Sequence, residues 1–238
     1  MNLQRLAAVL IYLTGILLTT ALGALAVWGD LEASLFDAAI RAETNLTSLR
    51  CPILITRRET GHVAASFRNT GQQLVNRAIR VHITQGFVTL MREEAVQLPL
   101  QPGQTQRLTW PVTAADAAYG SLILVRVSTL RQAPLPSESQ ACGIAVFDLP
   151  VGSGNLWGAL WLALGLAGIG GGGWLWLRVS RPLRGRRRTA ANASLAVAGV
   201  AVAVMLAGLA GAWMLGVLLL ALLTLLLGAI VAHLLLET

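Results

Sequence analysis

Few side chains in this sequence could do chemistry, and they are scattered along it. There are three histidines, at positions 62, 82 and 233, and two cysteines, Cys51 and Cys142. Catalysis needs a nucleophile or an acid–base pair held in a pocket, and no phosphate-binding loop, metalloprotease motif or nucleophile elbow is present. Two cysteines without a nearby histidine do not complete a tetrahedral metal site. We therefore predict no catalytic residue, no metal site and no enzyme activity.

The polar residues around His82 have an ordinary interpretation. His82 alternates with Arg80 on the polar side of a strand predicted over 78–84, so we expect its side chain to be solvated. Glu93 and Glu94 follow an apolar run and are typical of a solvated, charged loop.

His233 is the one titratable group inside the last apolar stretch of the chain. Ionisable residues within a membrane are functional candidates by default, which makes haem or chlorophyll binding at His233 a hypothesis. A bis-histidine haem would need a second membrane histidine, and the sequence has none. Because Glu237 lies one turn away, the ordinary alternative is a side chain that reaches the membrane interface. We expect no bound cofactor and keep His233 as the alternative.

The composition indicates that apolar helices must position whatever this chain carries. Hydrophobic residues make up 55% of it and charged residues 12%, about half the charge of a soluble domain. Uncharged runs span Leu6–Gly29, Leu149–Leu177 and, apart from His233, Thr189–Leu236. A membrane helix needs about 20 apolar residues, and glycines near 208–211 suit a turn. We predict four transmembrane helices, within 1–29, 149–177, 191–211 and 212–238.

The first apolar run has a second interpretation, because Ala24-Leu25-Ala26 has the form of a signal-peptide cleavage site. The run is longer than the usual core of a signal peptide, which favours a retained transmembrane anchor.

The arginines set the expected orientation. All 18 basic residues are arginine, and the formal net charge of +7 is concentrated in one loop over 178–190. By the positive-inside rule this loop is cytoplasmic, which places residues 30–150 outside and suggests a bacterial cytoplasmic membrane. The cluster sets topology or binds anionic lipid headgroups; its shortness argues against nucleic acid. Its members are Arg178, Arg181, Arg184, Arg186, Arg187 and Arg188.

Small residues recur at helix-packing spacing within the apolar runs. Such residues let helix backbones approach closely, so they predict packing within the four-helix bundle or docking of helices from another subunit. The predicted packing residues are Gly154, Gly158, Gly168, Gly172, Gly199, Ala203, Ala207 and Gly211.

Between the first two apolar runs the pattern changes twice. Residues 30–50 form an amphipathic linker, either a short helix or a continuation of the first membrane helix. From Cys51 to residue 148 short stretches alternate with period two and are separated by turn residues, which predicts a β-sandwich. The predicted strands are 52–57, 62–68, 78–84, 95–100, 106–112, 122–129 and 140–147.

Three segments of this region carry a family resemblance. They are Ser66-Phe67-Arg68-Asn69-Thr70-Gly71, Ile79-Arg80-Val81-His82-Ile83, and Leu98-Pro99-Leu100-Gln101-Pro102-Gly103-Gln104 before Leu108-Thr109-Trp110. Residues 52–147 resemble bacterial immunoglobulin-like extracytoplasmic modules. Such modules often show an Asn-x-Gly turn, here Asn69-Thr70-Gly71, followed by a Leu-x-Pro-Gly turn, here Leu100-Gln101-Pro102-Gly103. The resemblance implies a sandwich that adheres, spaces or docks and is rarely catalytic. It does not extend to the helices.

Cys51 begins the first predicted strand and Cys142 lies in the last. The first and last strands of a sandwich can lie close together, and the predicted topology puts both residues in an oxidising compartment. We predict a disulfide between them; the alternative is two buried thiols.

These features favour a non-catalytic accessory or scaffold subunit of a larger bacterial membrane complex, for which a respiratory or photosynthetic assembly is one host. Its partners would be other membrane subunits and, at the arginine loop, anionic lipid headgroups. The first alternative is a receptor or sensor with an immunoglobulin-like ligand-binding ectodomain. The second is a haem- or chlorophyll-binding subunit using His233.

Overall fold

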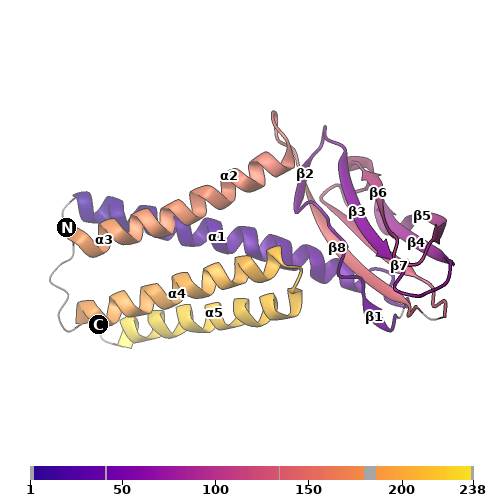
Figure 1. Cartoon of the computed structure of the whole chain (residues 1–238). Helices are drawn as coiled ribbons and strands as arrows, with labels where there is room; N and C mark the ends of the chain where they lie inside the picture. Colours follow the sequence, from indigo (N-terminus) through magenta and orange to yellow (C-terminus); the bar gives the residue numbers. More distant parts are fainter. Residues whose placement is uncertain (1–2, 41, 134, 180–185, 237–238) are drawn as a thin grey trace. The chain divides into compact units, whose positions relative to one another are not determined.

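The computed structural model describes residues 3–40, 42–133, 135–179 and 186–236. The chain forms two compact units, one made of Met1–Val27 with Trp157–Thr238 and the other of Trp28–Leu156. The first unit is helical, and the second contains the strands (Figure 1).

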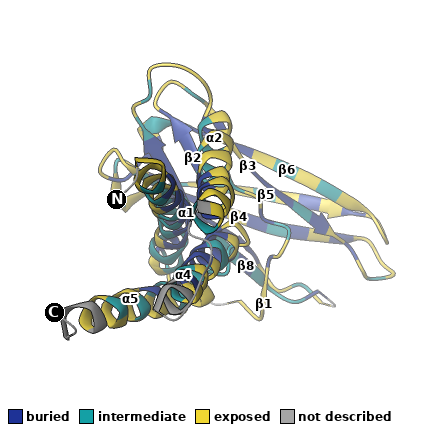
Figure 2. Ribbon diagram, turned by 90° about the vertical axis from the view of Figure 1, so that its left-hand side faces the viewer, coloured by how far each residue is buried: buried dark blue, intermediate teal, exposed yellow. Residues whose placement is uncertain are grey.

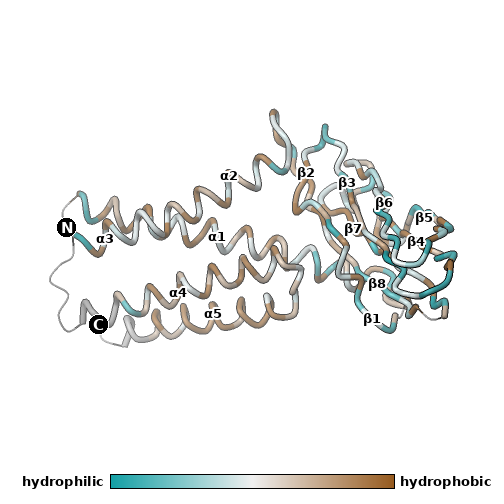
Figure 3. The backbone as a smooth tube through the Cα atoms, viewed as in Figure 1, coloured by the Kyte–Doolittle hydropathy of each residue, from teal (hydrophilic) through white to brown (hydrophobic). Residues whose placement is uncertain are grey.

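Four helical stretches are long and apolar enough to cross a membrane: Leu3–Leu35, Gly154–Arg178, Ala191–Leu209 and Trp213–Ala232. Within the most apolar window of the last stretch only 11% of residues are buried inside the chain. Apolar side chains exposed along a whole helix need an apolar surrounding, so composition indicates a membrane protein. Figure 3 shows the helices as largely apolar along their length.

The helices are α1 (Leu3–Leu35), α2 (Gly154–Ala167), α3 (Gly173–Val179), α4 (Arg186–Leu209) and α5 (Trp213–Leu236). A π-helical turn over Gly168–Gly172 joins α2 to α3. The turn between α4 and α5 falls where the glycines predict it, and Gly211 there has a left-handed φ of +70°.

The first part of the predicted linker over 30–50 takes the second of its two expected forms. It continues α1 as far as Leu35, because Ala33 and Phe36 are buried against Leu124 and this burial extends the helix. The predicted loop over 178–190 is shorter, since α4 begins at Arg186. The first turn of α4 therefore contains Arg186, Arg187 and Arg188.

The second unit contains two sheets. The larger has the strand order β1-β8-β7-β4-β5, with β2 paired to β8, and the smaller pairs β3 with β6. Both β1 and β2 run parallel to β8, and the other pairs are antiparallel. The strands are β1 (Thr44–Asn45), β2 (Leu54–Thr56), β3 (Gly61–Arg68), β4 (Val75–Gln85), β5 (Phe87–Leu100), β6 (Thr105–Val112), β7 (Leu122–Thr129) and β8 (Glu138–Phe147).

The core lies between the two sheets. Ile79, Val81 and Ile83 alternate inward from β4, as their spacing predicts, and are at most 1% exposed. Phe67 of β3 and Trp110 of β6 contribute large aromatic side chains to this core from the smaller sheet. Figure 2 shows the buried residues alternating along these strands.

Asn69 ties together the two turns that carry the family resemblance. It is fully buried, and its side-chain nitrogen donates to the carbonyls of Gln73 and Leu100 at 2.8 and 2.9 Å. Its carbonyl accepts from the backbone N–H of Gly103, whose φ of +74° suits glycine. The turn after Asn69 and the turn at Gly103 are therefore joined to each other by hydrogen bonds of Asn69.

The strand β5 corrects the prediction for residues 87–94. It begins at Phe87, directly after a turn at Gly86 with φ of +75°, and so includes Glu93 and Glu94. This strand is at an edge of the larger sheet and is exposed over much of its length, so its first half lacks the apolar–polar alternation that identifies a strand.

Candidate functional site

In the second unit, polar side chains of the sandwich bind the ends of two helices. The last turns of α1, from Trp28, and the first residues of α2, to Leu156, belong to the same compact unit as the strands. We call the contacts at these two helix ends the helix-end joint. It includes Arg126 and Glu59, each of which binds one helix end.

Arg126, from the middle of β7, binds the carboxyl end of α1. Its Nε donates to the carbonyl of Phe36 at 2.8 Å, and Nη2 donates to the carbonyl of Ser34 at 2.8 Å. A third bond runs from Nη1 to the carbonyl of Ile40 at 3.3 Å. Carbonyls at a helix C-terminus lack internal partners and carry partial negative charge, which a guanidinium satisfies.

Burial lowers the pKa of the Arg126 guanidinium, and the charge of Asp37 opposes that effect. Asp37 lies just after α1 and has a left-handed φ of +50°. Its carboxylate is 2.5 Å from Nδ1 of His82.

His82 corrects the expectation of a solvated side chain, since it is 8% exposed. It lies between two carboxylates: Asp37 on one ring nitrogen and, on the other, Glu93 with Oε1 at 3.7 Å. Cross-strand pairing puts His82 beside Arg126 and opposite Glu93. The end of α1 thus covers the polar face of β4 at His82, while Arg80 on the same face stays exposed. No group of three metal-ligating side chains suited to an ion occurs within the described ranges.

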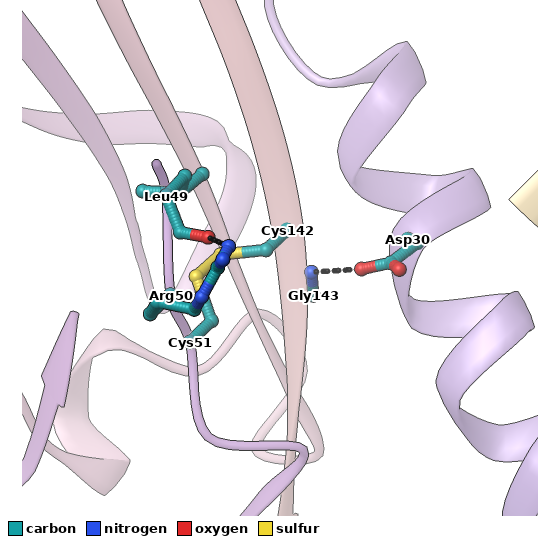
Figure 4. Close-up of a disulfide and its surroundings, with 6 residues drawn as sticks. All are labelled: Asp30, Leu49, Arg50, Cys51, Cys142 and Gly143. Atoms are coloured by element: carbon teal, nitrogen blue, oxygen red, sulfur yellow. Dashed lines mark hydrogen bonds between the residues drawn. A yellow bond between two sulfur atoms is a disulfide. The ribbon is translucent and has the colours of Figure 1, made fainter. Parts of the chain in front are cut away.

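Asp30 and Gly29 attach α1 to β8. Oδ1 of Asp30 accepts from the backbone N–H of Gly143 at 3.3 Å, and the backbones of Gly29 and Gly143 touch. The neighbouring residue, Cys142, forms the predicted disulfide with Cys51. Figure 4 shows both contacts: β8 is held by the disulfide on one side and by Asp30 on the other.

Glu59 binds the amino end of α2. Its Oε2 accepts from the backbone N–H of Gly154 at 2.6 Å and from that of Thr56 at 3.1 Å. The Oγ of Ser153 accepts from the N–H of Leu156 at 3.3 Å. An acid at a helix N-terminus complements the helix dipole, as a base does at the C-terminus. Each helix end thus meets a side chain of the opposite charge.

The predicted packing glycines lie in different surroundings. A Cβ built on Gly168 would lie 2.7 Å from Cα of Gly15, and one on Gly172 would lie 2.6 Å from the backbone nitrogen of Tyr12. The structure therefore places these two against α1. The same contact includes Gly165, which the sequence prediction left out and whose Cβ would lie 2.6 Å from Oγ1 of Thr19.

Two of the predicted packing positions are corrected, and Gly199 has no packing partner among the described residues. Gly154 packs on the backbone of Leu54 in β2 rather than on a helix, and Gly211 forms the α4–α5 turn. No atom of the described residues beyond its own helix lies within 4 Å of a Cβ built on Gly199. Gly158 and Ala203 are half-buried and Ala207 is buried. Spacing identified small residues, but which side of α4 faces inward depends on its partner: Met205 meets Gly23 there.

The remaining predicted residues lie largely beyond the described structure. Arg181 and Arg184 are outside the described residues, and so are the side chains of Arg186, Arg187, Arg188 and His233. Arg178 is described, and its guanidinium lies 5.0 Å from the centre of the Trp174 ring. This is a cation–π contact of the kind found near membrane interfaces.

Sequence reasoning missed the roles of Arg126, His82, Asp37 and Glu59. One signal was available: Arg126 interrupts the apolar run Leu122–Val127, and an arginine in a buried strand must find partners. The partner itself, the end of α1, lies about 90 residues away along the chain.

Two hollows open on the sandwich, of about 310 and 410 Å³. The larger is lined mainly by hydroxyl and amide side chains, among them Asn45, Thr47 and Thr70. At its floor Nη2 of Arg77 is 3.0 Å from Oε2 of Glu138.

No family model and no curated protein matches the chain. Among solved structures, the CARDB domain of a Pyrococcus furiosus protein, crystallised with di-metal ions, is 12% identical with a TM-score of 0.32. That match covers 42% of this chain and 90% of the domain, which is of the immunoglobulin-like sandwich type.

A β-glucosidase from Erythrobacter marinus is 20% identical, with a TM-score of 0.31, over 45% of this chain and 14% of its own. One from Listeria innocua is 17% identical, with a TM-score of 0.30, over 42% and 16%. The chain therefore spans a small part of both glucosidases. These distant likenesses carry no information about function, and the two-sheet arrangement follows from the strand pairing itself.

Proposed function

We propose that this chain is a non-catalytic accessory or scaffold subunit of a larger bacterial membrane protein complex. Its helices pack with those of other subunits, and its sandwich docks a partner outside the cytoplasm. The observation that carries the proposal is the helix-end joint, where Arg126 binds the C-terminus of α1 and Glu59 binds the N-terminus of α2. The polar chemistry of the sandwich is used to hold these helix ends.

The helix-end joint contains more hydrogen bonds than a covalent connection alone would need. Arg126 alone makes three hydrogen bonds to main-chain carbonyls, and His82 and Asp37 add a buried pair beside it. Helix ends attached to the strands only through the chain would not need such contacts. Side chains fixed in this way suit a sandwich that presents a preorganised surface.

The location outside the cytoplasm is supported by two independent features. The Cys51–Cys142 disulfide lies in the sandwich unit, and such bonds persist in oxidising compartments. The arginine cluster, at the other end of the α2–α3 span, predicts the cytoplasmic side. Together they favour a multi-pass protein of the bacterial cytoplasmic membrane with residues 30–150 outside.

The open face of α4 at Gly199 offers a test of docking by helices. We expect Gly199→Leu to remove partner subunits that co-purify with the tagged chain from its own membrane, while its disulfide and its melting profile stay unchanged. Leu218→Ala is the matched control: this α5 side chain is 69% exposed, and its all-leucine surroundings suit lipid. Retention of every partner by Gly199→Leu would contradict docking at this face.

Two other functions stay as alternatives. The receptor hypothesis is favoured by the polar hollow beside Arg77; binding of the purified chain to a glycan array, lost in Thr70→Trp, would support it. The pigment hypothesis at His233 is tested by the visible spectrum of the purified chain, since a His233→Ala variant that kept all absorbance would eliminate it.

A further inference from the structure

Large exposed apolar side chains gather at the turn between β4 and β5. Phe87, Leu90 and Met91 are 54, 54 and 42% exposed, and Tyr119 on a neighbouring loop is 74% exposed. We call these four residues the turn patch. Phe87 contacts Tyr119, while Leu90 and Met91 follow in β5 and point to its opposite faces, so the four residues surround the tip of the hairpin. Exposed apolar side chains that occur singly need no explanation, but several at one tip mark an interaction surface.

The turn patch is held in place by its own contacts. The rings of Phe87 and Tyr119 pack edge to face with centres 5.8 Å apart. The backbone N–H of Tyr119 donates to the carbonyl of Gly86 at 3.0 Å, which ties the two loops together. Tyr119 also has a left-handed φ of +52°, unusual for an aromatic residue. The loop therefore keeps an unfavourable backbone conformation while its ring stays exposed.

Both segments of the patch lack charge. Neither 84–91 nor 117–125 contains an acidic or a basic residue, and two charged side chains directly beside them, Arg92 and Asp116, form an ion pair at 3.7 Å. Segments that enter the interfacial layer of a bilayer favour aromatic and aliphatic side chains at the point of insertion, with charged groups beside them.

A residue beside the patch contacts the end of α1. Val88, next to Phe87, packs against the cluster of Ala33 and Phe36 there. Ala33 follows Trp28, an aromatic residue of the type that marks the membrane interface, by five residues, which is a rise of about 7.5 Å along the helix. This rise is similar to the thickness of the headgroup layer of one leaflet, roughly 5–8 Å, and this similarity motivates a lipid ligand for the patch.

We propose that the turn patch is an interfacial anchor that inserts Phe87, Leu90, Met91 and Tyr119 into the headgroup layer of the bilayer crossed by α1. Its ligand is lipid: acyl-chain and glycerol surface contacted by apolar side chains, with no charged headgroup selected. This inference rests on the membrane-spanning part of the proposed function and needs no partner subunit.

The test places a spin label at Leu90 in the full-length chain reconstituted as a single copy in phosphatidylcholine nanodiscs. Leu90→Cys adds one reactive thiol, because both native cysteines are in the disulfide. The collision rates of the label with oxygen, which concentrates in lipid, and with a water-soluble nickel chelate are then compared. A second label at Met91 guards against a local effect of one substitution.

Leu74→Cys is the matched control. Leu74 is an apolar residue of similar exposure, 57%, at the opposite end of β4. Since β4 extends from Val75 to Gln85, the two sites are about 35 Å apart at 3.3 Å per residue. This label should behave as a water-exposed one.

We expect the oxygen-to-nickel collision ratio to be several-fold higher at Leu90 and Met91 than at Leu74. Equal ratios at all three sites would overturn the proposal, because the patch would then be in water. Protection of Leu90 from both reagents would also overturn it, since protein rather than lipid would cover the patch. Failure of the chain to enter nanodiscs would instead contradict the membrane-spanning assignment, so the two failures are distinguishable.

Discussion

Gly143 and Gly29 meet backbone to backbone, so that a methyl group on Gly143 would overlap the carbonyl oxygen of Gly29. Gly143 also donates to Asp30 and follows the disulfide-bonded Cys142. The exit of α1 from its apolar span is therefore built directly onto the strand that the disulfide secures.

This contact predicts that Gly143→Ala destabilises the sandwich. Overpacking of this kind costs about 1–3 kcal/mol, because Gly143 is paired with Leu124 of β7 and Gly29 lies within helix α1. The free energy of unfolding of the sandwich, followed by denaturant titration of the purified chain, measures it. Gly228→Ala is the control: it adds a methyl in open space on α5. An unchanged midpoint in Gly143→Ala would show that the contact is loose.

Replacing Arg126 with methionine should detach the end of α1. The substitution keeps much of the side-chain volume but leaves the carbonyls of Ser34, Phe36 and Ile40 without their donor, at a cost of roughly 2–4 kcal/mol. Hydrogen exchange should rise at residues 28–36. In Arg80→Met, which removes an exposed arginine from the same cluster, exchange should stay near the wild-type rate. If both variants exchange alike, Arg126 does not hold the helix end.

Two glycines of one π-helical turn offer a matched pair for the helical unit. Gly168→Leu puts a side chain where the Cα of Gly15 lies, whereas Gly170→Leu enters open space. We expect only the first to lower the thermal midpoint of the helical unit in detergent, because it forces α1 away. Equal effects would mean that the α1 contact does not stabilise this unit.

The disulfide should account for a large part of the stability of the sandwich. It closes a sequence separation of 91 residues, worth about 4–5 kcal/mol when loop-closure entropy is counted. The double variant Cys51→Ser, Cys142→Ser should therefore unfold at markedly lower denaturant, and reductant should shift the wild type in the same way. A midpoint insensitive to both changes would refute this.

The helices could be predicted because uncharged runs and glycine breaks are local signals. The disulfide also followed from strand order, since Cys51 lies at the first predicted strand and Cys142 within the last. The helix-end joint could not, because Asp37 and His82 come together only when α1 extends onto the sheet. Likewise the spacing of Gly199 identified a small-residue row but not its orientation. The sequence patterns predict the helices and strands, while the partners of Arg126 and the side of α4 on which Gly199 lies depend on tertiary packing.

Native mass spectrometry of the chain extracted from its own membrane in mild detergent shows directly whether the chain belongs to a larger complex. We expect a defined multi-subunit mass above the 25.1 kDa of the chain, with the same partners in repeated preparations. A visible spectrum of the same sample would show any haem or pigment of the host. A stable, colourless species of 25.1 kDa alone would contradict the accessory-subunit proposal and favour the receptor alternative.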